Sequence, residues 1–261
     1  MNLRLIKLVV KTLVLGLLSA MAAGILYWLF FASNWSWFPT YLPLMIKGLS
    51  LTLQLFVISV VFGFILAVPI GLVQVTGPPW LAFLARWFCT VIRGTPLLIQ
   101  IWLLYYGLGS LFPSIPGIRD TFIWPVLREG YYYAALAFTL SFAGYEGEVM
   151  RGAFLGVPRG ELEAARAFGM SPWKVLTRVW LPRAMRLVLP TLAGETVLQL
   201  QSMPLAFTVT VMELVGVASK VRQDTYIVYE PLMFMGFVYI CLTFIFVYAF
   251  GLIEKMVPQK R

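Results

Sequence analysis

The sequence predicts an all-α polytopic membrane protein, and three observations lead to this fold class. Hydrophobic residues make up 61% of the 261 residues, and charged residues make up only 12%. A soluble domain is about half apolar and about a quarter charged, so one or two soluble domains cannot bury this much apolar surface. The apolar residues also form long runs, comparable to the ~20 residues that a helix needs to cross a bilayer.

Six spans are predicted from these runs. Asn34, Pro39 and Pro43 are turn signals that end the first span near Ala32. The stretch Gly77-Pro78-Pro79 ends the second span in the same way. The predicted spans cover residues 12–32, 46–74, 93–112, 131–153, 186–212 and 231–253.

The distribution of Lys and Arg predicts that both termini are cytoplasmic. With the N-terminus inside, 15 of the 20 basic residues fall in inner segments, as the positive-inside rule favours. These charges are spread over several loops, which argues against a nucleic-acid surface. A cleaved signal peptide ending near Ala20-Met21-Ala22 is the alternative for the first span. Its apolar run continues to Phe30, which favours a retained helix.

The composition also limits the chemistry. The chain contains no His, which excludes imidazole metal sites and His-based catalysis. Cys89 and Cys241 lie in separate apolar runs, so we expect core residues rather than a disulfide. There is no Gly-Lys dipeptide and therefore no Walker A loop for ATP phosphates. Any ATP-driven step requires another polypeptide.

Residues 151–186 form the one long polar segment between predicted spans. Two short helices are predicted in it, over 160–168 and 173–180, with Gly169 ending the first. Leu181-Pro182 is expected to close the second. One face of the first helix consists of Leu162, Ala165, Phe168 and Gly169. This face is expected to let another surface approach closely. An amphipathic loop lying on lipid headgroups is the alternative.

This segment resembles the EAA loop of bacterial ABC-importer membrane subunits. Glu163-Ala164-Ala165 is followed after three residues by Gly169, and after nine more by Val179. One residue further on, Leu181-Pro182 completes a pattern that departs from the family only by Val in place of Ile. The resemblance implies a type I importer permease fold. It also implies that Glu163, Ala164, Ala165 and Gly169 transmit the closure of an ATPase to the spans.

Two further stretches resemble the polar amino acid branch of this family, namely residues 93–100 and 148–153. Residues 206–211 are more similar to the membrane subunit of systems for histidine, lysine/arginine/ornithine, octopine or nopaline. The resemblance begins near Leu44. It therefore implies an extra N-terminal helix with an outer loop at 1–43 and a five-helix permease core at 44–261.

The resemblance also implies an assembly in the bacterial inner membrane. The chain would be a transport subunit with no catalytic residues, metal or cofactor of its own. A homologous membrane subunit would pair with it, and a heterodimer is favoured. A cytoplasmic ATPase dimer would bind ATP, and a periplasmic solute-binding protein would deliver the cargo.

Polar side chains in the fifth span are the first candidates for a substrate path. An ionisable group at mid-span costs ~2.5–3.5 kcal/mol on insertion scales, so its presence needs a reason. Glu195, Gln199 and Ser202 share one helical face, and Pro204 interrupts the helix just beyond them. Glu195 is expected to meet a substrate ammonium or guanidinium. Pairing with a neighbouring span or subunit is the alternative.

Three more polar residues are candidates for the path. Glu146 in the fourth span has no local partner and is a second candidate for cation selectivity, whereas Glu148 is spaced to pair with Arg151. Thr95 and Gln100 flank a predicted break at the start of the third span. They are expected to face either the path or a packing interface.

The sequence therefore predicts a permease subunit of an importer for a polar, and more narrowly basic, amino acid or opine. A neutral or acidic amino acid is the alternative cargo. An ion-coupled secondary carrier is the alternative from another class, but such carriers have internal inverted repeats, and none is visible in the sequence. A membrane-embedded enzyme would need clustered catalytic groups, whereas the acids are dispersed along this chain.

Overall fold

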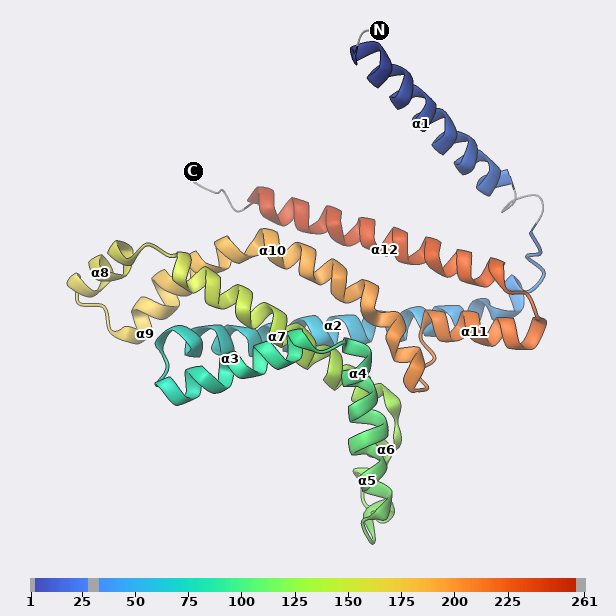
Figure 1. Cartoon of the computed structure of the whole chain (residues 1–261). Coiled ribbons are helices and arrows are strands. Elements are labelled where there is room, and N and C mark those ends of the chain that lie inside the picture. The colour runs from blue at the N-terminus through green and yellow to red at the C-terminus, as the bar shows by residue number, and fades with distance from the viewer. Residues whose placement is uncertain (1–2, 28–32, 257–261) are drawn as a thin grey trace.

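The computed structural model describes residues 3–27 and 33–256, and the regular elements in these ranges are all helices. Figure 1 shows long helices packed into one bundle, with α1 apart from it and the segment from α4 to α6 leading away from it. The predicted all-helical membrane fold is thereby confirmed in its class.

Five helices are long: α1 (Leu3–Tyr27), α2 (Phe38–Thr76), α7 (Gly130–Gly156), α10 (Leu181–Ser202) and α12 (Tyr229–Met256). The shorter α-helices are α3 (Pro79–Gly94), α4 (Leu97–Trp102), α5 (Gly109–Leu111), α6 (Trp124–Arg128), α8 (Arg159–Ala167), α9 (Pro172–Val175) and α11 (Leu214–Thr225). Two π-helical segments are η2 (Leu103–Leu108) and η5 (Leu176–Trp180). Three 3₁₀ segments are η3 (Phe112–Ser114), η4 (Ile118–Asp120) and η6 (Met203–Val209).

Three of the described helical segments are long and apolar enough to cross a membrane, namely Phe38–Thr76, Leu97–Ser114 and Tyr229–Lys255. A fourth results if Pro172–Val209 and Leu214–Thr225, bent by 47°, form one span. The number of six spans and the cytoplasmic termini therefore stay predictions. The expected end of the first span, within 28–32, lies outside the described residues.

Helix α2 begins at Phe38, inside the stretch for which turns were predicted, so that part of the prediction is wrong. Pro39 lies in the first helical turn, where the missing N–H has no intrahelical acceptor in any case. Aromatic packing stabilises this early start. The ring centroids of Phe38 and Phe234 lie 5.1 Å apart, and Trp37 is also close to Phe234. The start of α2 is thus packed against α12.

The most extensive helix contact joins α2 and α7. The buried face of α2 carries a small residue at every fourth position, namely Ser59, Gly63, Ala67 and Gly71. A Cβ atom on Gly71 would lie 2.6 Å from the Cβ atom of Met150 in α7. Small residues let two helix backbones approach closely, which is the usual basis of helix packing in membranes. This contact makes α7 the fixed support for α10.

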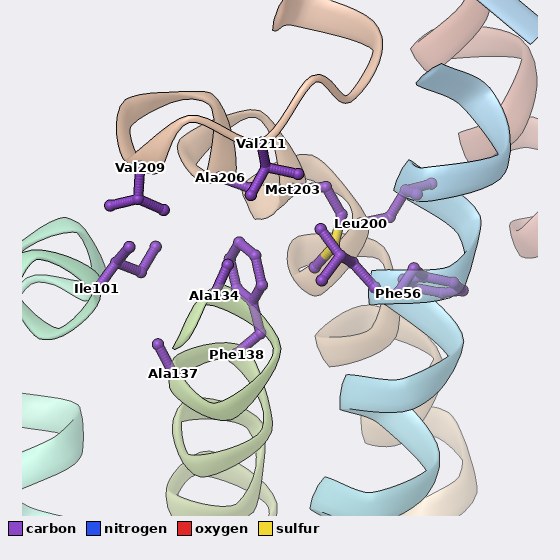
Figure 2. Packing of buried hydrophobic residues seen from close by; sticks show 11 residues of the cluster. Phe56, Ile101, Ala134, Ala137, Phe138, Leu200, Met203, Ala206, Val209 and Val211 are labelled. Carbon is purple, nitrogen blue, oxygen red and sulfur yellow. The ribbon is translucent and has the colours of Figure 1, made fainter. Parts of the chain in front are cut away.

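Buried apolar side chains anchor the elements that surround the end of α10. Figure 2 shows Phe56 of α2, Phe138 of α7 and Leu200 of α10 in one cluster, together with Ile101 of α4 and Met203 of η6. Phe138, Leu200 and Met203 are completely buried. The cluster therefore holds α4 and η6 against the bundle at the place where α10 changes to a 3₁₀-helix.

The polar segment between α7 and α10 contains the two short helices that were predicted. Gly169 ends α8 with a φ of 74°, a conformation that favours glycine. The second prediction is wrong in one respect, because Leu181-Pro182 does not close a helix. The chain runs from η5 directly into α10, so Pro182 lies inside a continuous helical stretch, just after the π-helical turn.

Candidate functional site: a polar cavity between α7 and α10

A cavity of about 170 Å³ lies where α7 and α10 meet the break between α3 and α4. Its lining consists of Thr95, Leu97, Ser141, Phe142, Tyr145, Glu195, Leu198, Gln199 and Ser202. Four of the six residues predicted for a substrate path lie in this set, namely Thr95, Glu195, Gln199 and Ser202. Gln100 and Glu146 are outside it. Sequence reasoning missed Ser141 and Tyr145, although their spacing of four residues places them on one face of α7.

The break between α3 and α4 positions Thr95 at the cavity. Gly94 ends α3, and both Thr95 and Pro96 have extended backbone angles. Gln100 stabilises this break, because its Nε2 atom donates to the backbone oxygens of Ile92 at 2.8 Å and Thr95 at 3.0 Å. The structure thus places Gln100 behind the break rather than in the cavity.

The polar face of α10 is oriented by a contact with α7. Gln199 is 6% exposed, and its Nε2 atom donates to the backbone oxygen of Phe138 at 3.1 Å. Ser202 lies further along the same face, and its hydroxyl donates to the oxygen of Leu198. Glu195 has neither a hydrogen bond nor an ion pair with any residue that the structure describes. Its carboxylate therefore faces the cavity without a partner from the described part of the chain.

A cation lies beside this cavity. The Cζ atom of Arg93 is 5.6 Å from the centre of the Tyr145 ring, and Tyr145 lines the cavity. The charges of Arg93 and Glu195 are close enough to interact, but no ion pair within 4.0 Å joins them. Nothing in the sequence relates these two residues, because they belong to elements far apart along the chain.

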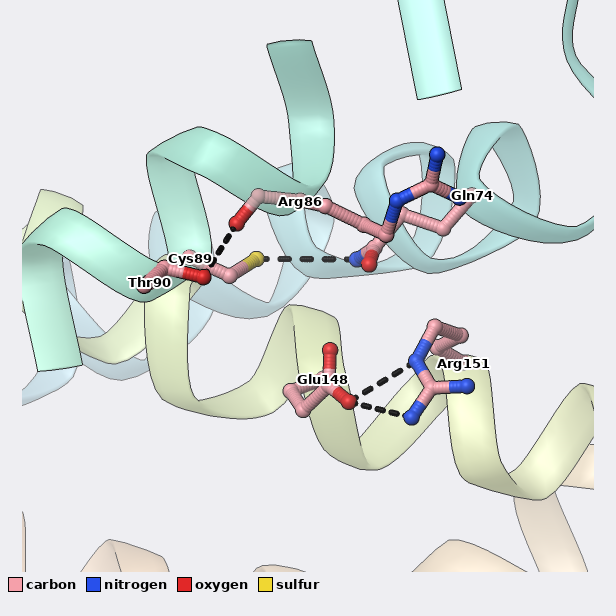
Figure 3. A network of polar contacts seen from close by, with 6 residues as sticks. All are labelled: Gln74, Arg86, Cys89, Thr90, Glu148 and Arg151. Atoms are coloured by element: carbon pink, nitrogen blue, oxygen red, sulfur yellow. Dashed lines mark hydrogen bonds and ion pairs between the residues drawn. The ribbon is translucent and has the colours of Figure 1, made fainter. Parts of the chain in front are cut away.

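Two acidic residues of α7, Glu146 and Glu148, differ in burial and in their partners. Glu146 is completely buried, and neither of its carboxylate oxygens has a hydrogen-bond partner among the described residues. It lies close enough to Glu195 for like charges to repel. Glu148 forms the predicted ion pair with Arg151, and its Oε1 atom accepts from the Arg151 Nε atom at 2.8 Å. Figure 3 shows this pair beside the contact between Gln74 and Cys89.

The face of α8 that was expected to receive another surface packs onto this chain instead. Leu162 and Ala165 are 9% and 7% exposed, and they belong to a buried apolar cluster that also contains Phe154 of α7 and Ala184 of α10. Ala165 therefore does not present itself to another molecule. Glu163 and Ala164 lie on the exposed side, and Phe168 at the end of α8 is 87% exposed.

The turn after α8 is open to solvent. A Cβ atom on Gly169 would meet nothing within 4 Å, and the next helix places the ring of Trp173 in a 71% exposed position. Exposed aromatic side chains such as Phe168 and Trp173 are typical anchors of protein interfaces. The outward face of the segment is thus formed by Glu163, Ala164, Phe168, Gly169 and Trp173.

Comparison with known proteins finds a family match that extends over most of the chain. Residues 59–258 match the family described as "binding-protein-dependent transport system inner membrane component". The chain is 40% identical over 218 residues to the octopine transport system permease protein OccM of Rhizobium radiobacter, covering 83% of this chain and 87% of the relative. It is 34% identical over 208 residues to the histidine/lysine/arginine/ornithine transport system permease protein HisM of Escherichia coli K12, covering 80% and 86%.

Solved structures have the same fold. The crystal structure of an amino acid ABC transporter with histidines superposes with a TM-score of 0.72 at 27% identity, covering 86% of this chain and 99% of the other. An inward-facing MetNI methionine ABC transporter superposes with a TM-score of 0.68 at 19% identity, which supports the fold alone. The cavity and the polar segment both lie within the matched residues, and the chain belongs to the family of binding-protein-dependent transport system inner membrane components.

Proposed function

We propose that this chain is the membrane permease subunit of an ATP-driven importer for a polar amino acid or opine that carries a positive charge. The observation that carries this proposal is the position of Glu195. Its carboxylate lines a cavity within the bundle and has no partner among the described residues. A charged group at such a place is costly unless a ligand or another chain compensates it.

Named relatives support the choice of cargo. Three relatives are named as permease proteins for octopine, for nopaline and for histidine, lysine, arginine and ornithine. An ammonium or guanidinium group in such a cargo would complement Glu195. Thr95, Gln199 and Ser202 would supply hydrogen bonds around it, since hydroxyl and amide groups fix the orientation of a small ligand. Glu146 would add negative charge behind the cavity.

The assembly follows from the family. A binding-protein-dependent inner membrane component works with a binding protein and an ATPase, and this chain has no Walker A loop. We place six spans, cytoplasmic termini and an extra N-terminal helix at 1–43 in the same proposal. A homologous membrane subunit, in a heterodimer, would complete the path.

The polar segment would dock on the ATPase. Glu163, Ala164 and the turn at Gly169 would make the contact, because they lie on its exposed side. Ala165 would act indirectly, through its packing against the bundle. Since η5 continues into α10 without a break, a displacement of this segment passes to the helix that carries Glu195. ATP binding would thereby open the cavity to the outside, and hydrolysis would reset it.

Transport by the complete complex tests this proposal. The chain is co-expressed with its neighbouring membrane, ATPase and binding subunits and reconstituted in proteoliposomes, and uptake of labelled arginine is followed with and without ATP. We expect ATP-dependent uptake that falls at least tenfold in Glu195→Gln, while ATPase activity stays stimulated by the binding protein. Glu129→Gln, which removes an exposed acid just before α7 and outside the cavity lining, is the matched control.

The outcomes separate the parts of the proposal. Uptake that is unchanged in Glu195→Gln would keep the importer and make Glu195 a structural residue. An assembled complex that takes up no basic amino acid or opine would contradict the proposed cargo. Transport that proceeds without ATP, driven by an ion gradient, would favour a secondary carrier.

A further inference from the structure

A positive charge lies next to the cavity that contains the negative Glu195 in its lining. Arg93 ends α3 two residues before the cavity-lining Thr95, and its guanidinium lies over the ring of Tyr145, which also lines the cavity. Glu195 faces the same space from α10. Glu195 thus lines the cavity from α10, whereas Arg93 of α3 lies outside the lining and contacts it through Tyr145.

These opposite charges do not neutralise each other directly. No ion pair within 4.0 Å joins Arg93 to Glu195, although the two charges are close enough to interact. The guanidinium instead rests on an aromatic face, which is a weaker contact than a hydrogen-bonded carboxylate. Arg93 also has no acidic hydrogen-bond partner among the described residues. A ligand with a separated anion and cation would give each of the two groups a partner of opposite charge.

We infer that Arg93 binds the carboxylate of the cargo while Glu195 binds its cation. This inference rests on the proposed function and names the group that receives the carboxylate of the cargo. Guanidinium groups present a planar fork of N–H donors that matches both oxygens of a carboxylate. A cargo that leaves Arg93 unpaired would lose these hydrogen bonds, so cations without a carboxylate are discriminated against.

The backbone of Arg93 is held in place by the break between α3 and α4. The break between α3 and α4 is held by Gln100, whose side chain binds Ile92 and Thr95 on either side of it. Arg93 lies between these two residues, so its backbone is fixed while its side chain is exposed. The guanidinium can leave Tyr145 and turn to the cargo without a change in the helices.

Arginine and agmatine are the probes that test this inference. Agmatine is arginine without the carboxyl group, so the two cations differ in the group that Arg93 would bind. The complex of membrane and ATPase subunits is placed in lipid nanodiscs without the binding protein, which would otherwise select the cargo itself. Displacement of labelled arginine by unlabelled arginine, agmatine or octopine is then measured.

Two variants and a control accompany the wild type. We expect wild type to bind arginine at least tenfold more tightly than agmatine. Arg93→Gln should lower the affinity for arginine to that for agmatine and leave agmatine binding unchanged, and Arg93→Lys should restore part of the difference. Arg86→Gln removes the same charge from the same helix α3, away from the cavity, and should behave like wild type (Figure 3).

The wild-type comparison stands even if a variant does not fold. Equal binding of arginine and agmatine to the wild type overturns the inference, as does a complex that binds neither arginine nor octopine. Arg93→Gln that keeps the tenfold preference also overturns it and assigns the carboxylate to another group. The proposed function is tested separately by ATP-dependent uptake, which can persist when the two probes bind equally.

Discussion

Arg183, at the start of α10, holds Glu161 of α8 through two hydrogen bonds. The Nε atom donates to Oε2 and a terminal nitrogen donates to Oε1, each at 2.8 Å. This bidentate pair joins the polar segment to the helix that carries Glu195. It supplements the packing of Leu162 and Ala165, so α8 is attached to α10 by charge as well as by apolar contact.

Breaking this pair is expected to uncouple ATP hydrolysis from uptake. Glu161→Gln should change thermal stability little, because a partly exposed ion pair contributes less than about 1 kcal/mol. Uptake per ATP hydrolysed should fall severalfold in proteoliposomes. The exchanged variant Glu161→Arg with Arg183→Glu should recover much of the coupling. Uptake per ATP that stays at the wild-type value in Glu161→Gln would argue that the apolar contacts suffice.

Gly71 is expected to be intolerant of even a methyl group. Its Cβ atom would lie 2.6 Å from Met150 Cβ and 2.8 Å from the backbone nitrogen of Arg151. Gly71→Ala should therefore force α2 and α7 apart and destabilise the protein by about 1–3 kcal/mol. Gly152→Ala is the matched control, since nothing lies within 4 Å of the new atom. Thermal unfolding of the two variants in detergent should rank them in this order.

Glu146 and Glu148 should respond in opposite directions to the same substitution. Glu146→Met removes a buried carboxylate with no partner among the described residues, so stability should rise by about 1–3 kcal/mol. Glu148→Met breaks the ion pair with Arg151, so stability should fall by less than about 1 kcal/mol. The melting temperatures of the purified variants check this. Lower arginine uptake by a more stable Glu146→Met would support a role of this acid in the path, and a destabilised Glu146→Met would indicate a missing partner.

Two donors of the α4 and η2 region hold η6 in place. The indole nitrogen of Trp102 donates to the Thr208 hydroxyl at 3.1 Å, and the Tyr106 hydroxyl donates to the Thr208 backbone oxygen at 3.0 Å. Trp102→Phe with Tyr106→Phe should weaken this attachment by about 1–3 kcal/mol in total. Hydrogen exchange of residues 203–210 should become faster. Tyr132→Phe removes a hydroxyl that has no hydrogen bond to any residue in 3–27 or 33–256, so it should leave that exchange unchanged.

Local features of the sequence predicted most of the helices. The break at Thr95, the change to a 3₁₀-helix near Pro204 and the turn at Gly169 all depend on residues adjacent in the chain. The pairing of Glu148 with Arg151 is equally local, since it depends on helical spacing. Such features are readable because backbone preference and helical period act over a few residues.

Contacts between distant elements were not predictable in the same way. The helices Pro79–Gly94 and Leu214–Thr225 were missed because both lie between the predicted spans and contain charged residues. The inward direction of Ala165 depends on α7 and α10, and the approach of Arg93 to the cavity depends on Tyr145. Each of these facts arises from packing between helices, which one sequence without an alignment does not specify.

The π-helical turn η5 makes the length of the chain a part of the proposed coupling geometry. A π-turn holds one residue more than an α-turn, and each residue of an α-helix corresponds to about 100° of rotation. Loss of one residue from 176–180 would therefore turn α8 by about a quarter of a circle around the axis of α10. The side chains that we propose to contact the ATPase would all be kept, yet Glu163 would point in a new direction. Counting residues in this turn is thus as informative as identifying them when related chains are compared.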